Sequence, residues 1–430
     1  MATFVAEGSP QTIITREQVV DMVERVLANV TDSSRMLVIP PDTTRSQSGA
    51  GIVTEALHEK AEAEVFDVLP ALGTHRPMTR EQIRVMYGEQ IPLGAFKEHD
   101  WRTGLSLLGH VPARFVHDVS GGVLEPIMPD YDVPIQINDL IVDGGYTALL
   151  SVGQVVPHEV TGMANGVKNV AVGVGGAETI NKSHFLGAAY GMERMMGRID
   201  TPVRRVLNYA HREHLATFGI IYILTVIGID DAGDPVMRGF FAGDDLATFT
   251  HAADLTQQVN IHLVDEPLQK TVVYASPDKF KSTWLSNKAI YRTRMAIADG
   301  GHLIILAPGV DKFGEDTQID ALIRKYGYRD RTRIMESVRD NDDLRQNLCA
   351  AAHLIHGSSE GRFNITYATD PDRLSREEVQ AVGFTWMNIR QAMKQCPPEK
   401  MRDGFNDDFY FVREPGMGLW ALAEQFDAQL

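Results

Sequence analysis

Short apolar runs that end in polar loops alternate with helical segments along the first part of the chain. Residues 36–40 and 65–69 are apolar and short enough to form buried strands, and a polar loop follows each of them. Thr15 and Thr79 each precede a glutamine by three residues, a spacing typical of the capping box at the start of a helix. This alternation predicts an α/β fold, in which the loops that bind ligands lie at the carboxyl ends of parallel strands.

The middle of the chain is rich in glycine and in apolar runs. Residues 103–137 are predicted to be rich in β-structure, and residues 170–174 to form a strand. The apolar segment 218–229 is long enough for a central strand, and a helix is expected at 244–258.

The alternation restarts in the last part of the chain, where a helix is expected at 282–299. Strands are predicted there at 271–275, 302–306 and 363–367. We therefore expect two α/β domains, residues 1–265 and residues 266–430, with an active-site cleft between them.

The charge and cysteine content exclude several classes of protein. The chain has 41 Lys and Arg against 57 Asp and Glu, a formal net charge of −16, with no basic cluster, so nucleic acid and anionic membranes are not expected partners. Cys349 and Cys396 lie far apart and form no CxxC motif, which argues against a disulfide framework or a thiolate zinc site. With no signal peptide pattern or membrane-spanning run in the sequence, a cytoplasmic protein is expected.

Against this acidic background, a few basic and imidazole side chains lie in loops beside glycine or proline. His158 stands between an apolar strand and a glycine-rich loop, where an exposed histidine would be unusual. Gly162 and Gly166 would let the backbone approach a ligand closely just before Lys168. The set comprises Arg45, Arg76, His99, His158, Lys168 and His184.

Two segments then resemble a known family. His158-Glu-Val-Thr-Gly-Met-Ala-Asn-Gly-Val-Lys168 and Glu178-Thr-Ile-Asn-Lys-Ser-His184 resemble the lactate racemase (LarA) family, whose members use a nickel pincer nucleotide. The motifs Asp42-Thr-Thr-Arg45, Gly73-Thr-His-Arg76 and Glu98-His99-Asp100 agree with family motifs in the same order. The resemblance covers most of residues 1–265, the expected cofactor-binding and catalytic domain, and is fainter in residues 266–430, expected to close the cleft.

The resemblance implies how the cofactor is held. Lys168 would attach it covalently, as a Ni(II) pyridinium-3-thioamide-5-thiocarboxylic acid mononucleotide, and His184 would be the protein ligand to nickel. Neutral imidazole suits the fourth position of a square-planar nickel site. Proteins that synthesise the cofactor would then be partners of this chain.

The resemblance also implies an isomerase that inverts C2 of a 2-hydroxy acid by reversible hydride transfer. His99 and His158 would be the acid/base pair, because the two enantiomers present their hydroxyls on opposite sides. Imidazole titrates near neutral pH, so it can transfer a proton in either direction.

The remaining site residues would bind anionic groups or the substrate side chain. Arg76 suits the substrate carboxylate but equally a cofactor phosphate, and the same two roles are open for Asp42, Thr44 and Arg45, which we group with the cofactor. In the second domain, Lys288 matches a family lysine at the cleft, with Trp284 and Leu285 beside it as further substrate-binding candidates.

Several positions depart from the family pattern. Leu285 replaces a common glutamine, Ser46 a common proline, and Asn165 the first glycine of a Gly-Gly pair. These changes favour a substrate larger or more apolar than lactate, with a sugar acid (aldonate) as the alternative. Two other classes are also considered: a metal-dependent hydrolase with His99, His158 and His184 as zinc ligands, and a noncatalytic anion-binding relative.

Overall fold

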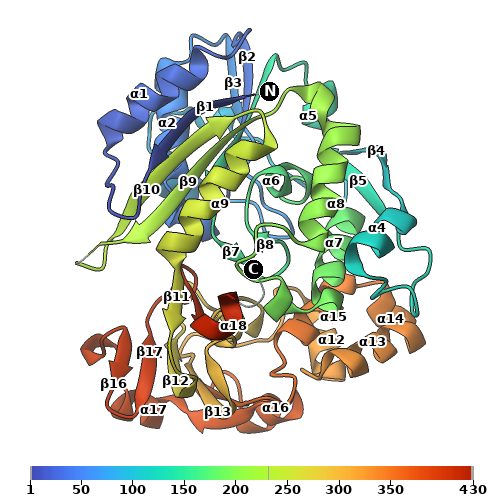
Figure 1. Cartoon of the computed structure of the whole chain (residues 1–430), viewed down its shortest axis with the longest axis vertical. Helices are drawn as coiled ribbons and strands as arrows, with labels where there is room; N and C mark the ends of the chain where they lie inside the picture. Colours follow the sequence, from blue (N-terminus) through green and yellow to red (C-terminus); the bar gives the residue numbers. More distant parts are fainter. Residues whose placement is uncertain (1, 231, 428–430) are drawn as a thin grey trace. The chain divides into compact units, whose positions relative to one another are not determined.

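The computed structural model describes residues 2–230 and 232–427, and its helices and strands confirm the predicted α/β class (Figure 1). The chain divides into two compact units. The first comprises the described residues of Met1–Gly122, Asp130–Ser183 and Ile199–Asn260, and the second those of Val123–Pro129, His184–Arg198 and Ile261–Leu430. The segment His184–Arg198 therefore belongs to the second unit although it lies in the first half of the sequence. The expected boundary at residue 265 stays a prediction.

The first unit is built on a mixed sheet with the strand order β1-β10-β9-β6-β2-β3. Strands β3, β2, β6 and β9 run parallel, whereas β10 pairs antiparallel with both β9 and β1. Two antiparallel pairs, β4 with β5 and β7 with β8, lie outside this sheet. The strands are β1 (Thr3–Gly8), β2 (Arg35–Ile39), β3 (Val65–Val68), β4 (Leu105–Val111), β5 (Val133–Asn138), β6 (Ala148–Gln154), β7 (Pro157–His158), β8 (Gly162–Met163), β9 (Ile221–Ile229) and β10 (Pro235–Gly243).

Helices cover this sheet, with α9 along β9 and β10 and with α1 packed against α2 (Figure 1). The predicted capping boxes are confirmed at Thr15, before α1, and at Thr79, before α3. The α-helices up to residue 260 are α1 (Arg16–Leu27), α2 (Ala50–Lys60), α3 (Arg80–Tyr87), α4 (Ala113–Ser120), α5 (Asp139–Asp143), α6 (Val167–Ala171), α7 (Ala177–Tyr190), α8 (Pro202–Ala210) and α9 (Leu246–Asn260). Shorter turns are η1 (Thr43–Ser48), η2 (Leu93–Ala95), η3 (Met192–Arg194), the π-helical η4 (His211–Leu215) and η5 (Ala216–Phe218).

The structure differs from the sequence-based expectation in the middle of the chain. Within 103–137, β4 and β5 are separated by helix α4, so the segment is less rich in β-structure than predicted. The apolar run 170–174 does not form a strand, because helix α6 extends to Ala171. The predicted central strand is confirmed as β9, which lies between β10 and β6.

The second unit contains its own sheet, with the strand order β15-β14-β13-β12-β17-β16. Neighbouring strands are parallel except for β16 and β17, which form an antiparallel pair. The short strands β11 and β18 pair separately and in parallel. The strands are β11 (Ile261–Val264), β12 (Leu268–Tyr274), β13 (Ile297–Leu306), β14 (Asn364–Thr369), β15 (Thr385–Asn388), β16 (Gly404–Asn406), β17 (Phe409–Val412) and β18 (Leu419–Leu422).

The helix expected at 282–299 is wrong in its length. Two short helices, α10 and α11, end at Thr293, and β13 begins at Ile297. The helices of this part are α10 (Thr283–Ser286), α11 (Lys288–Thr293), α12 (Thr317–Tyr326), α13 (Arg331–Asp340), α14 (Asp342–Arg345), α15 (Leu348–His356), α16 (Arg376–Ala381), α17 (Ile389–Gln395), α18 (Ala423–Asp427) and the 3-10 turn η6 (Pro398–Lys400).

Arginine side chains hold the segment His184–Arg198 within the second unit. Glu193 Oε1 pairs with Arg294 Nε at 3.1 Å and with Arg362 Nη1 at 2.7 Å. Arg331 Nη1 donates to the carbonyl oxygens of Ala189 at 3.3 Å and Tyr190 at 3.4 Å, the last residues of α7. These bonds satisfy carbonyls that the end of a helix leaves without partners.

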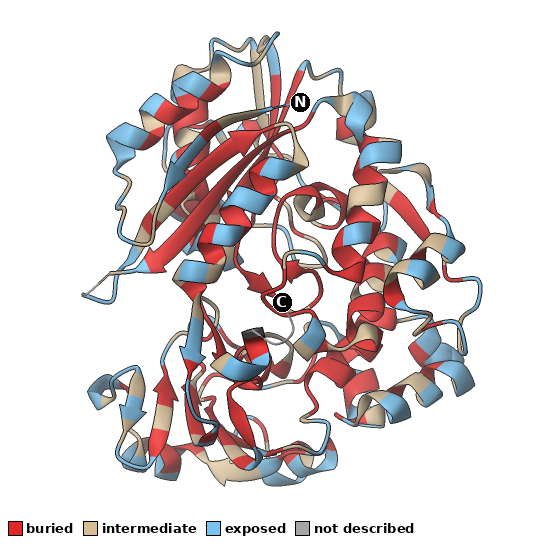
Figure 2. Cartoon of the chain, in the orientation of Figure 1, coloured by how far each residue is buried: buried red, intermediate tan, exposed pale blue. Residues whose placement is uncertain are grey.

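The cores of both units are formed by their central strands, which are largely buried (Figure 2). Strand β6 is buried along its whole length and β9 along all but its last residue. Such continuous burial is typical of strands covered on both faces. None of the helices in the described part of the chain combines the length and the apolar character that a membrane span requires.

Candidate functional site

Three loops with predicted site residues follow parallel strands of the first unit. Residues 42–45 follow β2, residues 73–77 follow β3, and the β7–β8 hairpin with His158 follows β6. Because β3, β2 and β6 are parallel neighbours, these loops begin at the same edge of the sheet, as expected for an α/β fold.

Hydrogen bonds from helix α6 and the turn after it connect these parts of the first unit. Asn169 Nδ2 donates to the carbonyl oxygen of Ile39 at 2.9 Å and to Ser151 Oγ at 3.0 Å, which joins α6 to β2 and β6. The N–H of Gly73 donates to the carbonyl oxygen of Gly173 at 2.8 Å. Lys168, the second residue of α6, therefore lies in a segment bonded to β2, to β6 and to the loop that follows β3.

The turn before α6 has an unusual backbone. Asn165 and Gly166 both have positive φ angles, 65° and 63°. Asparagine tolerates this left-handed conformation better than most residues, which explains how a residue other than glycine is accommodated at position 165. Its Oδ1 accepts the N–H of Gly166 at 2.7 Å. Its Nδ2 would lie 2.2 Å from a Cβ atom on Gly153, so only glycine fits at that position of β6.

Charged side chains surround Lys168. Burial and the nearby cations Arg45 and Arg204 lower the pKa of its amine to about 8, although Glu159 and Asp42 oppose them. A lysine with this pKa has a much larger uncharged fraction at neutral pH than an exposed one. Uncharged amine is the form that forms covalent bonds with electrophiles.

Asp42 is occupied by contacts within the protein. Its Oδ1 accepts the N–H of Thr44 at 3.2 Å and the Thr44 hydroxyl at 2.5 Å, and its Oδ2 lies 2.7 Å from Nδ1 of His75. Burial raises the pKa of Asp42, but the pair with His75 and the bonds from Thr44 outweigh it and lower the pKa. Asp42 thus fixes the η1 turn and, through its pair with His75, also holds the loop of residues 73–77. Arg76 is exposed on that loop.

His158 is 6% exposed and lies in the β7–β8 hairpin. Its Nδ1 accepts the N–H of Val160 at 3.1 Å. A nitrogen that accepts a hydrogen bond carries no proton, so the neutral ring has its proton on Nε2. The Glu159 carboxylate lies 4.0 Å from Nδ1.

His99 is 3% exposed, and both of its ring nitrogens have partners inside the first unit. Nε2 lies 3.1 Å from the carbonyl oxygen of Gly175, and Nδ1 lies 3.1 Å from Nδ2 of Asn138. Burial lowers the pKa of His99, although the Gly175 carbonyl and Asp100 oppose this effect. Proton transfer at His99 therefore requires that one of its two hydrogen bonds opens.

The second unit contains the other predicted substrate residues on the short helices α10 and α11. Trp284 and Leu285 lie on α10, and Lys288 is the first residue of α11. The ring of Trp284 packs 4.4 Å from that of His353, which is hydrogen-bonded to Tyr291 and Tyr328.

Asn287, between the two helices, is fixed in the same core. Its Oδ1 accepts the Tyr367 hydroxyl at 2.6 Å. A buried polar network thus holds the turn that precedes Lys288.

In the first unit, Asp42 and Arg45 lie near Lys168, and Thr44 is bonded to Asp42. His158 belongs to the same unit and precedes Lys168 closely in the sequence. His184, the predicted nickel ligand, lies on α7 and belongs to the second unit with Trp284, Leu285 and Lys288. Sequence reasoning missed Arg204, Asn138, His75 and Glu159, which contact or face the predicted residues.

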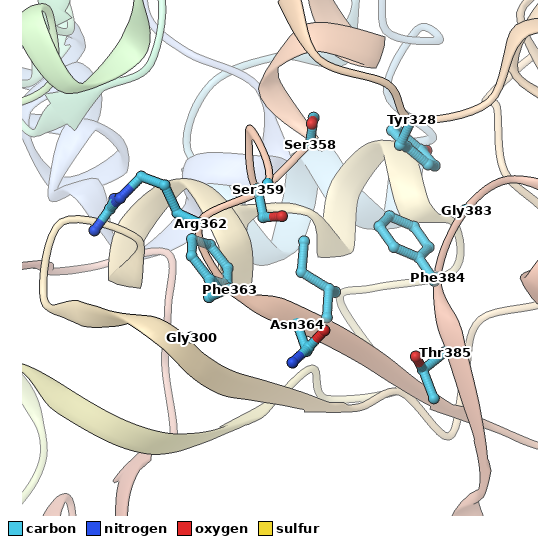
Figure 3. Close-up of a pocket in the computed structure, with 13 residues that line it drawn as sticks. Gly300, Tyr328, Ser358, Ser359, Arg362, Phe363, Asn364, Gly383, Phe384 and Thr385 are labelled. Atoms are coloured by element: carbon cyan, nitrogen blue, oxygen red, sulfur yellow. The ribbon is translucent and has the colours of Figure 1, made fainter.

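Figure 3 shows a pocket of about 290 Å³ in the second unit. It lies at the amino ends of β14 and β15, where Asn364 and Thr385 begin these strands, and the rings of Tyr328 and Phe384 stack 4.5 Å apart in its wall. The predicted site residues do not line it. Ligand sites of α/β folds are more often at the opposite, carboxyl ends of the strands.

Within residues 2–230 and 232–427, no three His, Cys, Asp or Glu side chains lie close enough together to hold a metal ion. The alternative of a zinc site formed by His99, His158 and His184 therefore has no support in the described residues.

The sequence model of the lactate racemase N-terminal domain matches residues 7–112 and 129–195, a region that includes His99, His158, Lys168 and His184. This part of the chain is therefore similar to the N-terminal domain of lactate racemases.

Two solved structures are similar to this chain in fold. A crystal structure of a Thermotoga maritima protein is 24% identical, with a TM-score of 0.81, covering 97% of this chain and 99% of that chain. The lactate racemase apoprotein of Thermoanaerobacterium thermosaccharolyticum is 18% identical, with a TM-score of 0.67, covering 96% of this chain and 94% of that chain. None of the curated protein sequences compared with the chain matches it.

Proposed function

We propose that this protein is an isomerase that racemises or epimerises a 2-hydroxy acid with a nickel pincer nucleotide attached to Lys168. The observation that supports it most directly is the state of Lys168. Its amine has a pKa lowered to about 8 and stands among the charges of Arg45 and Arg204, in a chain with a lactate racemase N-terminal domain.

The residues around Lys168 fit such a group. An uncharged amine can form a thioamide, and the guanidinium group of Arg45 supplies positive charge for a phosphate. The bound nucleotide would supply a ring position that accepts and returns hydride from C2 of the substrate. His184 would hold its nickel ion.

His158 and His99 would move the hydroxyl proton of the two enantiomers. His158 keeps its proton on Nε2 when neutral, because Nδ1 accepts the N–H of Val160. His99 would exchange a proton after one of its bonds to Gly175 or Asn138 opens. Arg76, exposed on its loop, would bind the substrate carboxylate or the cofactor phosphate.

The substrate would be a 2-hydroxy carboxylate larger than lactate. Trp284 and Leu285 support this proposal, since Trp284 is an apolar side chain held in place against His353. A sugar acid is the other substrate class to test. We expect a cytoplasmic enzyme that depends on cofactor-synthesis proteins.

Mass spectrometry of the full chain produced together with cofactor-synthesis proteins tests this function. The expected result is an adduct on Lys168 and about one nickel ion per chain, lost in Lys168→Ala and retained in the control Lys97→Ala, whose lysine pairs with Asp67 elsewhere in the first unit. A known lactate racemase produced in the same cells is the positive control. If that enzyme acquires the cofactor while Lys168 stays unmodified, the proposed function is wrong.

Racemisation assays of the adduct-bearing protein then define the substrate. A series of 2-hydroxy acids graded by side-chain size and charge, with aldonic acids included, should show the highest kcat/KM for an apolar side chain larger than methyl. Highest activity on an aldonic acid would identify a sugar-acid 2-epimerase instead.

A further inference from the structure

The turn that precedes Lys168 needs support from outside its own sequence. Asn165 and Gly166 are consecutive residues with φ angles of 65° and 63°. A non-glycine residue in this conformation costs about 1 kcal/mol or more, so surrounding contacts must hold it. These contacts come from helices α8 and α9.

Arg204 of α8 makes the central contact with this turn. Its side chain is 3% exposed, its Nη2 donates to the carbonyl oxygen of Met163 at 2.7 Å, and its Nη1 donates to that of Asn165 at 3.2 Å. One planar guanidinium thus joins the carbonyls on both sides of Ala164. Lysine could not reproduce this, because its single ammonium lacks the fork of two donors.

Phe249 of α9 holds the guanidinium from its other side. The Arg204 guanidinium carbon lies 3.9 Å from the centre of the Phe249 ring. A Cβ atom on Gly166 would lie 2.9 Å from the same ring, so the turn, Arg204 and Phe249 pack in close succession. Thr201, the N-cap of α8, adds a bond from its hydroxyl to the carbonyl oxygen of Thr161 at 3.2 Å.

Burying the charged Arg204 side chain costs more free energy than a purely structural contact requires. Burial lowers the pKa of its guanidinium to about 9, and among the described residues no acceptor bonds its buried Nε. A buried donor without a partner destabilises a fold, so the two bonds to the carbonyls must offset this cost of Nε. The positive charge of Arg204 also disfavours the protonated form of the Lys168 amine, as the charge of Arg45 does. The negative charges of Glu159 and Asp42 have the opposite effect.

We propose that Arg204 is a positioning residue for Lys168: it holds the turn that precedes the lysine and supports the reactivity of the Lys168 amine. This inference rests on the proposed function, in which Lys168 is the attachment point of the cofactor. It assigns a part in that attachment to a residue on a different helix.

Competitive labelling of amines with acetic anhydride tests the proposal. The full chain is produced without cofactor-synthesis proteins and labelled from about pH 6.5 to about pH 10, and peptide mass spectrometry compares Lys168 with exposed Lys281. In the unchanged protein, the labelling midpoint of Lys168 should lie near its pKa of about 8. In Arg204→Met the midpoint should rise by about one unit, which reduces labelling at about pH 7 roughly tenfold.

Arg205→Met is the matched control, because Arg205 is the next residue of α8, is exposed and pairs with Asp200. Its labelling profile should equal that of the unchanged protein. A folded Arg204→Met protein with an unchanged labelling midpoint would overturn the proposal.

Arg204→Lys separates the hydrogen bonds from the charge and replaces Arg204→Met if that protein does not fold. It should keep the labelling midpoint, because the cation remains, but incorporate cofactor at least about fivefold more slowly, because the two-carbonyl contact is lost. Incorporation at the rate of the unchanged protein would overturn the proposal.

The labelling experiment needs no cofactor. A shifted midpoint in a protein whose Lys168 never acquires an adduct would therefore contradict the proposed function and leave the role of Arg204 intact.

Discussion

The side-chain amide of Asn138 donates a hydrogen bond to Nδ1 of His99 over 3.1 Å. The amide nitrogen faces the ring because Asn138 Oδ1 accepts the N–H of Leu140 at 3.0 Å as the cap of α5. A donor opposite Nδ1 leaves that nitrogen without a proton and places the proton of the neutral ring on Nε2, toward Gly175. Asn138 therefore selects the tautomer of His99.

Asn138→Asp should reverse this preference. The carboxylate can still cap α5, because Asp is as good an N-cap as Asn, but it presents an acceptor to Nδ1 and favours the charged imidazolium. We expect the pKa of His99, which burial lowers in the unchanged protein, to rise by at least about one unit. Imidazole NMR titration measures it, with Asp139→Asn as the control in the neighbouring residue; an unchanged His99 titration would contradict the selection.

Replacement of either proposed acid/base residue should separate cofactor attachment from turnover. His158→Ala and His99→Ala should each retain the Lys168 adduct but lose racemisation by about a hundredfold or more, since general acid–base catalysis contributes about this much. Adduct mass and initial rates are measured on the same samples.

His110→Ala is a suitable control for this pair, because His110 is exposed and bonded to Asp132 rather than near Lys168. A doubly substituted His99 and His158 protein that carries the adduct and is fully active would refute the acid/base assignment.

The stability of the protein should fall in mildly acidic solution. Burial lowers the pKa of four histidines, His99, His211, His262 and His302, relative to the unfolded chain. The unfolded state then binds more protons below about pH 6.5, so the free energy of unfolding decreases as the pH falls from there through the folded-state pKa values.

Urea unfolding at about pH 7.5 and about pH 5.5 measures this dependence. Carboxylates with lowered pKa values stay ionised in this window and do not contribute. His211→Gln should make the pH dependence shallower, whereas exposed His251→Gln should leave it unchanged. Equal stability at the two pH values would show that these histidines do not control it.

The contact between Gly153 and Asn165 predicts a destabilisation with a defined rescue. Gly153→Ala would place a methyl group 2.2 Å from Asn165 Nδ2 and should cost about 1–3 kcal/mol. Adding Asn165→Gly removes that side chain and should restore part of the loss, while the rest remains because Gly153 has a φ of 155°, which L side chains rarely adopt. Urea unfolding of the two single variants and the double variant measures the coupling; simple additivity would mean that another contact causes the loss.

Local patterns predicted the elements whose signals lie within a few residues. The capping boxes at Thr15 and Thr79 and the strand β9 followed from short-range spacing and apolar length. The strand predicted at 170–174 was wrong, because the first residues of this run belong to helix α6. Asn169 in that helix is bonded to Ile39 of β2 and Ser151 of β6. That contact joins residues far apart in the sequence.

The candidate site residues were predicted only where the sequence resembles motifs of the lactate racemase family. Lys168 and His158 lie within such motifs, but Arg204 and Arg205 are adjacent arginines that the sequence does not distinguish. One is buried under Phe249 and the other is exposed beside Asp200, a difference set by which face of α8 packs inward. Asn138 was missed for the same reason, because its partner His99 is distant in the sequence and only the fold brings the two side chains together.

The anchoring of Glu193 by Arg294 and Arg362 has a consequence for biosynthesis. The segment His184–Arg198 leaves the ribosome long before the arginines that bind it. Nascent chains must therefore hold Glu193 without these partners until Arg294 and then Arg362 have been synthesised. A fragment that starts at Ile261 would lack Glu193, the carboxylate that binds both Arg294 and Arg362, so a single cut in the gene does not separate the two units.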